Sequence, residues 1–406
     1  MCAMFCKVSR IAKLMALCGC TFFGAGQAWA SGFRIPETSV AGVSVANALV
    51  ANPEALGALS YNPAAMTFHH GNQLSVDVFA IDPQLSVTTA SGEHVSGVDT
   101  IYVPALFAMH EAGRWAWGLG VNAPFGLQTR WAPGTFPVLF GPRAALHPAL
   151  SKLEMLNINP NIAYQLSDAT SLSAGLDYYY VDKVVLNSAG VNIDGDGDGY
   201  GFNLAALHRA GPWSLGVSYR SAVDADIDGR VNDTAARTEL NFPWLLQVGV
   251  RYKSTDALAL EFDIERTGWS RFDSIVINSA ATGAELVRST NGWRDTNAYR
   301  LGVSYDLTPA MQLRFGYALD HTAQDDTNFS ARIPDADRQL FSAGVAYSAQ
   351  GWTVELGYMH VVFDERDYRA SAAFGAYGRD ANGTNAYNGD YAAQVDIVGL
   401  GVSRTF

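Results

Sequence analysis

The sequence predicts an all-β protein, a transmembrane antiparallel β-barrel of about fourteen strands with an N-terminal hatch in its lumen. Three observations lead to this prediction. Segments of about ten residues alternate between apolar and polar or small side chains along most of the chain. After residue 30 there is no run of about 18 to 20 apolar residues, which excludes helical membrane spans. The chain also ends on an aromatic residue, Phe406, at the end of such a segment.

Residues 1–30 have the organisation of a secretory signal peptide. Three basic residues precede an apolar stretch, and Ala28-Trp29-Ala30 supplies a small-x-small cleavage site. The apolar stretch is too short to span a bilayer. We therefore expect cleavage after Ala30 and a mature chain that begins at Ser31.

All cysteines of the chain fall within this peptide, so the mature chain has no thiol for a disulfide, a metal site or a nucleophile. An alternative cleavage before Cys20 would leave a lipidated cysteine, because Leu17-Cys18-Gly19-Cys20 loosely resembles a lipoprotein cleavage site. The four cysteines are Cys2, Cys6, Cys18 and Cys20.

The charge balance excludes a nucleic-acid partner. The chain has 27 Lys and Arg against 39 Asp and Glu, and removal of the three basic residues of the signal peptide leaves 24 against 39, a net charge of −15. An acidic chain repels the phosphate backbone. A hydrophobic content of 49% is too high for a disordered chain.

Each alternating segment has one apolar face and one polar or small face. In residues 257–265, every second side chain from Leu258 to Ile264 is apolar, while Glu261 and Asp263 lie on the other face. A soluble β-sandwich would alternate in the same way. Segments of about ten residues cross a bilayer at a tilt, and aromatic residues gather near their ends as interfacial girdles, so we expect lipid outside and a polar lumen inside. Fourteen such segments begin near Gln73, Asp99, Arg114, Leu153, Thr170, Gly201, Pro212, Glu239, Ala257, Asn297, Met311, Gln339, Gly351 and Gln394.

Residues 31–71 differ from the rest of the mature chain. Ser39 to Leu59 is rich in Ala, Val and Gly and lacks strand alternation, so we expect short helical turns and loops there. We expect a segment of this length that precedes the first strand of a barrel to lie in the lumen. The predicted domains are a signal peptide at 1–30, a hatch at 31–71 and a barrel with extracellular loops at 72–406.

Short motifs spread over the mature chain carry a family resemblance. In this order they make the chain similar to the FadL/TodX family of outer-membrane transporters for long-chain fatty acids and other hydrophobic compounds. The segment from Val395 to Phe406 also resembles the last strand by which outer-membrane barrels are handed to their assembly machinery. The motifs include Ser31-Gly32-Phe33, Tyr61-Asn62-Pro63-Ala64, Phe125-Gly126-Leu127, Ser218-Tyr219-Arg220-Ser221, Gly268-Trp269-Ser270 and Ile333-Pro334-Asp335-Ala336-Asp337-Arg338.

The resemblance implies passive transport without a cofactor. In the family, a ligand is captured in an apolar groove among extracellular loops and passes to a pocket reached by the mature N-terminus. It then leaves sideways, after the hatch rearranges, through a gap at a kinked third strand. The resemblance implies that Phe33 touches ligand and that Pro124 and Gly126 make the kink, since proline lacks a ladder donor and glycine relaxes the backbone. The implied hatch and gate residues are Asn62, Pro63 and Ala64, next to the gap, and Asn122, Pro124, Phe125 and Gly126, at the kink.

The segment from Trp131 to Leu150 is apolar, with four prolines and no acidic residue. By strand order we expect it in the third extracellular connection, where an apolar loop is costly unless it binds something. It either packs on itself or forms the capture groove, and the resemblance favours the groove. A ligand head group would favour one nearby cation, for which Arg288 and Lys183 are the candidates, but contact with lipopolysaccharide or solvent is the preferred interpretation of both. The candidate ligand contacts are Phe33, Trp131, Phe136, Leu139, Phe140, Leu146 and Arg288.

Metal and catalytic motifs are incomplete. Asp194 to Gly199 opens like a calcium loop, but its twelfth position is Ala205 rather than glutamate, so a flexible acidic loop is the preferred interpretation. The eight histidines show no metal-binding spacing, and the sequence has no Gly-x-Ser-x-Gly elbow. We therefore predict no catalytic residue, no metal and no cofactor. An outer-membrane lipase or protease is the enzyme alternative.

The predicted function is passive uptake of a hydrophobic small molecule, a fatty acid or a hydrocarbon, by a monomer in the outer membrane. Its other expected partners are membrane lipid, lipopolysaccharide and the outer-membrane assembly machinery. A nonspecific porin is the main alternative, and the two differ in ion conductance because a filled lumen conducts little.

Overall fold

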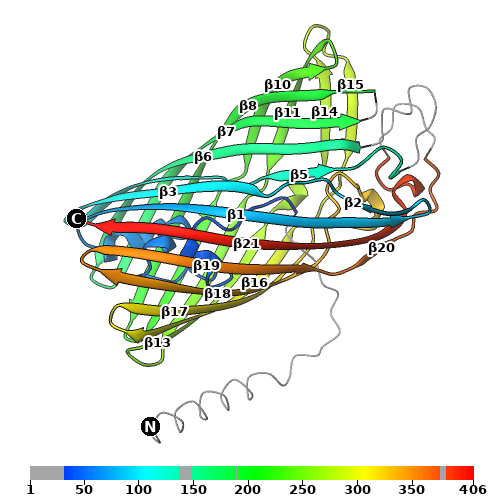
Figure 1. Cartoon of the computed structure of the whole chain (residues 1–406). Helices are drawn as coiled ribbons and strands as arrows, with labels where there is room; N and C mark the ends of the chain where they lie inside the picture. Colours follow the sequence, from blue (N-terminus) through cyan, green and yellow to red (C-terminus); the bar gives the residue numbers. More distant parts are fainter. Residues whose placement is uncertain (1–31, 137–147, 189, 375–380) are drawn as a thin grey trace, which may run out of the picture.

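The computed structural model describes residues 32–136, 148–188, 190–374 and 381–406. Its strands form one closed antiparallel sheet, in which β1 (Asn72–Thr89) pairs with both β3 (Ile101–Ala112) and β21 (Gly389–Thr405) (Figure 1). The predicted barrel is therefore confirmed. Among the described residues, no helix is long and apolar enough to cross a membrane.

The barrel wall consists of fourteen crossings, as the sequence predicts. Besides β1, β3 and β21, six crossings are single strands: β6 (Pro148–Ser167), β7 (Thr170–Ser188), β8 (Ile193–Ala210), β17 (Met311–Asp320), β18 (Arg338–Ala349) and β19 (Trp352–Phe363). The other crossings are pairs of successive strands: β4 (Trp115–Asn122) with β5 (Leu127–Arg130), β9 (Trp213–Arg220) with β10 (Val223–Val231), β11 (Thr234–Phe242) with β12 (Leu245–Lys253), β13 (Leu258–Thr267) with β14 (Ser274–Ser279), and β15 (Glu285–Thr290) with β16 (Thr296–Thr308). In the described parts of the connections lie the short strands β2 (Gly92–Val95) and β20 (Arg366–Tyr368) and the 3₁₀ turns η4 (Trp269–Arg271), η5 (Asp326–Asn328) and η6 (Asn385–Tyr387).

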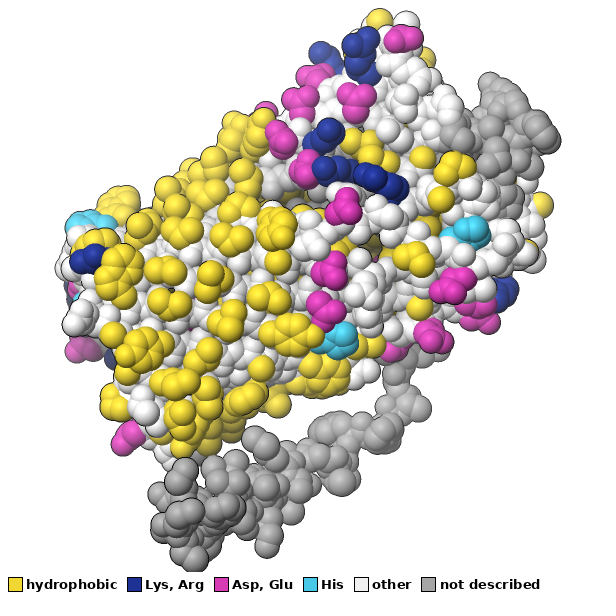
Figure 2. Space-filling view, in the orientation of Figure 1, with side chains coloured by type: hydrophobic (Ala, Val, Ile, Leu, Met, Phe, Trp, Pro, Cys, Tyr) yellow, Lys and Arg dark blue, Asp and Glu magenta, His cyan; other side chains and the backbone are white. Residues whose placement is uncertain are grey.

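The apolar face of each strand points outward and the polar face points into the barrel. On β13, Phe262 and Ile264 are 41% and 43% exposed, whereas Glu261 and Asp263 are 2% and 1% exposed. This is the reverse of a soluble protein and is the arrangement expected in lipid. Figure 2 shows the result on the visible face as a broad apolar area over the part of the barrel that carries the C-terminus, with most charged side chains beyond it.

The orientation follows from the connections. Short turns join the strands at the end of the barrel that carries Asn72 and Thr405, and longer connections lie at the other end (Figure 1). Outer-membrane barrels have short periplasmic turns and long extracellular loops. The end with Asn72 and Thr405 is therefore periplasmic.

The N-terminal segment lies inside the barrel, with α2 (Val40–Val43), η1 (Leu56–Ser60) and η2 (Pro63–Phe68) separated by turns (Figure 1). Carboxylates of the wall accept hydrogen bonds from its backbone. The N–H of Val50 donates to Asp263 at 3.0 Å, and the N–H of Ala51 donates to Glu261 at 2.7 Å. The lumen is thus filled, as the predicted hatch requires.

Glycines in the wall make room for the hatch. A Cβ added at Gly316 would lie 2.1 Å from the backbone carbon of Val45, and one added at Gly216 would lie 2.0 Å from the carbonyl oxygen of Val50. Any side chain at these positions would collide with hatch backbone, so the glycines fix how deeply the hatch sits. An added Cβ would lie within 3.1 Å of a hatch atom at five more wall glycines, and with Gly216 and Gly316 these form what we call the glycine band: Gly216 (β9), Gly249 (β12), Gly302 (β16), Gly316 (β17), Gly344 (β18), Gly357 (β19) and Gly399 (β21).

Candidate functional site

Five aromatic side chains contact one another in the part of the lumen beyond the hatch, towards the extracellular end. The ring of Phe33 lies 4.8 Å from Trp269, 5.1 Å from Phe272, 5.7 Å from Trp293 and 5.9 Å from Phe125, measured between ring centroids. All five are buried, and we call them the aromatic box. The sequence pointed to Phe33 and Phe125 but not to Trp269, Phe272 and Trp293. The only signal for the last three was the Gly268-Trp269-Ser270 motif, which names one of them and assigns it no role.

The third crossing is interrupted beside the box. β4 ends at Asn122, opposite Asn157 of β6, and β5 begins at Leu127, opposite Leu153 of β6. Residues 123–126 between the two strands form the kink. The kink lies in the stretch where the sequence placed it, because a proline and a glycine within four residues prevent a continuous ladder.

The wall is incomplete on the other side of the kink. β3 pairs with the third crossing only from Leu106 to Ala112, through partners on β4. Within the described residues, no pairing joins residues 101–105 of β3 to the kink or to β5. The two neighbouring crossings therefore diverge at this level.

The kink pairs instead with the N-terminal segment inside the barrel. The N–H of Ile35 donates to the carbonyl of Pro124 at 2.9 Å, and the N–H of Gly126 donates to the carbonyl of Phe33 at 3.1 Å. A Cβ on Gly126 would lie 2.7 Å from Cδ1 of Ile35. The backbone on either side of Arg34 thus replaces a strand of the wall, and the same segment carries the central ring of the box.

A cavity of ≈ 40 Å³ separates the box from the wall at the kink. This is room for about three water molecules. Its apolar lining includes Pro124, Phe125 and Tyr179, and its polar lining includes Arg34 and Arg220. The cavity therefore lies beside the kink, between the N-terminal segment and the barrel wall.

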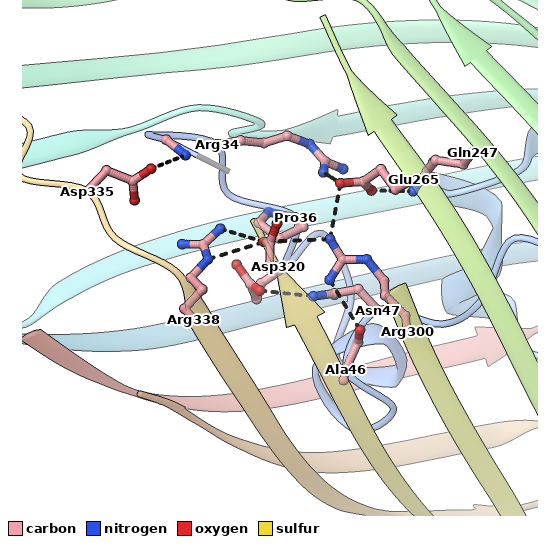
Figure 3. A network of polar contacts seen from close by, with 12 residues as sticks. Arg34, Pro36, Ala46, Asn47, Gln247, Glu265, Arg300, Asp320, Asp335 and Arg338 are labelled. Atoms are coloured by element: carbon pink, nitrogen blue, oxygen red, sulfur yellow. Dashed lines mark hydrogen bonds and ion pairs between the residues drawn. The ribbon is translucent and has the colours of Figure 1, made fainter. Parts of the chain in front are cut away.

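Buried ionic contacts hold the N-terminal segment in place (Figure 3). Arg34 pairs with Glu265 of β13, which also accepts from Gln247 of β12 at 2.8 Å and from Arg300 of β16 at 3.1 Å. The side chain of Arg34 therefore ties the segment to three crossings of the wall. Removing one partner of such a buried pair costs about 3–5 kcal/mol, because the other charge is left buried.

The connection between β17 and β18 holds the start of the described chain. The N–H of Gly32 donates to Asp335 at 3.1 Å, and the hydroxyl of Thr322 donates to the same carboxylate at 2.5 Å. Burial raises the pKa of Asp335 above its usual value. Gly32 has a φ of 62°, and a Cβ there would lie 2.4 Å from the ring of Trp293, so only glycine fits against the box.

The structure corrects the expected place of the Trp131 to Leu150 segment. It follows β5 and leads into β6, so it belongs to the second extracellular connection and not the third. Trp131 and Phe136 are each 2% exposed, and the indole of Trp131 donates to the carbonyl of Ala331 at 2.8 Å. The described part of this segment packs against other extracellular connections and does not form an open groove. Leu139, Phe140 and Leu146 lie outside the described residues. We call the packed set the extracellular cap, and its large members are Trp131, Phe136, Phe329, Tyr368, Tyr387 and Tyr391.

A second apolar hollow lies among the extracellular parts of β7, β8, β10, β11 and β14. Ile193, Ile227, Leu240 and Ile277 line it, and its walls are almost wholly apolar. The sequence did not single out this hollow, because its lining is contributed by five strands of consecutive crossings and depends on their pairing register.

Arg288 does not reach this hollow or the box, contrary to expectation. It lies on β15 opposite Val276, whereas the hollow is lined by the flanking Ile275 and Ile277. Successive residues of a strand face opposite sides, so Arg288 faces away from the hollow. Its guanidinium pairs with Glu285 at 2.6 Å, with both side chains nearly half exposed.

Asn62-Pro63-Ala64 follows directly on Ser60 and Tyr61, which line the cavity at the kink together with Asn122 and Pro124. Asn62 accepts from the N–H of Ala64 at 3.1 Å and donates to the carbonyl of Ala206 on β8 at 3.1 Å. The motif caps η2 and anchors the hatch.

The acidic segment from Asp194 to Gly199 is part of β8 and is not a flexible loop. Its aspartates pair in register with β10, where Asp196 lies opposite Asp228 and Asp198 lies opposite Asp226. Strand pairing fixes the carboxylates on the outer face of the sheet. The extended backbone holds them too far apart to surround a cation. In the described parts of the chain, no group of three or more His, Cys, Asp or Glu residues could hold a metal ion.

Residues 21–406 match the family model described as "Outer membrane protein transport protein (OMPP1/FadL/TodX)". The chain is 25% identical over 423 residues to the long-chain fatty acid transport protein of Escherichia coli O6:H1, covering 87% of this chain and 93% of that protein. It is 26% identical over 479 residues to the putative outer membrane protein NMB0088 of Neisseria meningitidis serogroup B, covering 98% and 99%.

Solved structures share the fold. The crystal structure of a Pseudomonas aeruginosa FadL homologue has a TM-score of 0.79 at 18% identity, covering 93% of this chain and all of that one. The Pseudomonas putida toluene transporter TodX has a TM-score of 0.67 at 16% identity, covering 87% and 94%. With the match over nearly the whole chain, these findings establish that the protein belongs to the OMPP1/FadL/TodX family of outer membrane transport proteins, which are β-barrels and not enzymes.

Proposed function

We propose that the protein takes up hydrophobic small molecules, fatty acids or hydrocarbons, passively across the outer membrane, and that ligand leaves sideways at the kink. The observation that carries this proposal is the backbone pairing of Phe33 and Ile35 with Gly126 and Pro124. It joins the central ring of the aromatic box to the discontinuity in the wall. The names of relatives, a long-chain fatty acid transport protein and a toluene transporter, support the substrate range.

Capture takes place at the extracellular surface. The apolar hollow lined by Ile193, Ile227 and Ile277 supports this step, because apolar surface that is open to water is costly unless it binds a ligand. The extracellular cap is the second candidate surface, since Trp131 and Phe136 belong to it and the residues that follow them are strongly apolar.

Transfer into the lumen requires Phe33 to leave the aromatic box. Burial of a phenylalanine side chain is worth about 1.5–3 kcal/mol. A ligand of similar apolar area recovers the same amount, so the exchange is close to balanced and runs in either direction. Transport then needs no energy source, and partition of the ligand sets its direction.

Exit follows from the same movement. When Phe33 withdraws, Gly126 loses the acceptor of its N–H and Pro124 loses the donor to its carbonyl. The kink is then held only through β6, next to the part of β3 that pairs with β1 alone. Ligand passes between β3 and the kink into the membrane. Residues 31–71 act as the hatch in this scheme, residues 72–406 form the barrel, and the mature chain begins at Ser31 after loss of the signal peptide.

The test is to close the kink. Replacing Pro124 with Val restores a ladder donor, and replacing Gly126 with Thr adds a side chain that pushes against Ile35, whose flexible end can yield. Uptake of a radiolabelled hydrophobic substrate by cells should fall, while binding at the surface persists. The matched control is Ala343→Val, which adds bulk to an exposed position on the lipid face of β18. Wild-type uptake by the double variant would show that ligand leaves along the barrel axis instead.

The porin alternative predicts a different electrical behaviour. The hatch occupies the lumen between the periplasmic mouth and the box, which supports a low conductance. Deletion of residues 32–59 should raise single-channel conductance several-fold in planar bilayers. Equal conductance before and after the deletion would mean that these residues do not close the pore.

A further inference from the structure

One polar group in the aromatic box has no partner. Within the part of the chain that the structure describes, the indole Nε1 of Trp269 is buried and has no hydrogen-bond acceptor. Buried tryptophan N–H groups usually find a partner, and an unpaired donor is costly. The ring of Phe33, which is in edge contact with Trp269, offers no lone pair.

The unpaired N–H lies on the side of the box that the hatch closes. Cζ2 of Trp269 is 3.0 Å from the position that a Cβ on Gly32 would take. Nε1 is two covalent bonds away from Cζ2, on the same edge of the indole. The donor therefore borders the space that Gly32 and Phe33 vacate when the hatch moves.

That space is shaped for an aromatic ring. Phe33 makes aromatic contacts with four rings at centroid distances of 4.8–5.9 Å, and those with Trp269 and Phe272 are edge-to-face. Each such pair adds roughly a two- to twelve-fold factor in affinity beyond area burial. None of the five side chains of the box carries a charge, so a carboxylate there would be buried without a counter-ion in the box.

We infer that the box selects a single-ring aromatic molecule with one hydrogen-bond acceptor, such as an aryl ketone or aryl ester. The ring takes the position of Phe33, and the acceptor receives the N–H of Trp269. This inference rests on the proposed function, because the ring enters only when the hatch moves. It narrows the substrate class beyond hydrophobic molecules in general.

Two probes isolate the hydrogen bond. Ethylbenzene and acetophenone share the ring and nearly the same shape, and they differ by a CH₂ group in place of the C=O acceptor. Their affinities are measured by isothermal titration calorimetry on the full mature protein in lipid nanodiscs. The Trp269→Phe variant keeps a ring and removes the N–H. The matched control, Trp213→Phe, makes the same change in the lipid-facing girdle, where Trp213 is 47% exposed.

In wild type and in Trp213→Phe, the ratio of the affinity for acetophenone to that for ethylbenzene should exceed the ratio of their partition coefficients into the nanodisc lipid. Trp269→Phe should weaken acetophenone about three- to ten-fold, the worth of one hydrogen bond, and leave ethylbenzene within about two-fold. An unchanged ratio of the two affinities in Trp269→Phe overturns the inference. The inference is also overturned if wild type binds dodecane or dodecanoate but binds neither acetophenone nor ethylbenzene. The proposed function stands in that case. If wild type binds none of the four probes, the proposed function fails together with the inference.

If Trp269→Phe does not fold, the inference can be tested on the wild-type protein by spectroscopy. Ultraviolet resonance Raman difference spectra report hydrogen bonding of indole N–H groups. Acetophenone should shift this signal for about one tryptophan, and ethylbenzene should leave it in place. Identical difference spectra for the two probes overturn the inference.

Discussion

Replacing Gly316 with Val should unseat the hatch without unfolding the barrel. A Cβ at this position lies 2.1 Å from the backbone carbon of Val45, where ordinary contact begins at 3.4 Å, and valine adds two further methyl groups. The obstacle is hatch backbone rather than the end of a flexible side chain. Val45 must therefore move by more than 1 Å away from β17.

The cost falls on the contacts that seat the hatch. Val50 and Ala51 donate to the buried carboxylates of Asp263 and Glu261. A typical hydrogen bond is worth about 0.5–1.5 kcal/mol, so the loss of these two weakens seating by about 1–3 kcal/mol, or roughly 5- to 150-fold in the equilibrium. The strand pairing of β17 with β16 and β18 uses only backbone groups and is unaffected.

Single-channel conductance in planar bilayers measures the outcome, with heat-modifiable migration in gels as the test of a folded barrel. Gly316→Val should conduct several-fold more than wild type, and Ala343→Val, on the lipid face, should not. A folded Gly316→Val barrel with wild-type conductance would refute the view that the glycine band seats the hatch.

Three further predictions concern other parts of the chain. The intact mass of exported protein should correspond to a chain that begins at Ser31, and a lipidated Cys20 species would contradict this. Trp131→Ala should weaken the extracellular cap by about 3–5 kcal/mol, the usual cost of deleting a buried tryptophan. Limited proteolysis should then cut the cap faster than in wild type, and an equal cleavage rate would show that the packing of Trp131 does not stabilise the cap. Burial, followed by repulsion from nearby carboxylates, raises the pKa of Asp337 to about 7. Because the folded state then binds the proton more tightly than the unfolded state, unfolding free energy should fall as pH rises from about 4 to 7; Asp337→Asn should flatten this dependence in chemical denaturation, and an equal slope in the variant would exclude Asp337 as its source.

The local pattern of the sequence was sufficient for the wall. Period-two alternation is a property of neighbouring residues, and in β13 it assigns Phe262 to lipid and Asp263 to the lumen without knowledge of any partner strand. The kink is local in the same sense, because Pro124 and Gly126 disrupt a ladder wherever the strand is placed. The lack of alternation in residues 31–71 likewise excluded them from the wall.

The site depended on contacts that no local pattern encodes. Trp269, Phe272 and Trp293 join Phe33 only because barrel closure brings β13 and its following connection opposite the kink, across more than 230 positions of sequence. Strand register decided that Arg288 faces away from the hollow. The glycine band is also invisible locally, since a glycine in a strand has the same sequence signature whether or not a hatch lies against it. Side-chain alternation is set by backbone geometry within one strand, whereas the box, the hatch seat and the orphan indole N–H are set by which strands meet, and that is fixed only when the barrel closes around its own N-terminus.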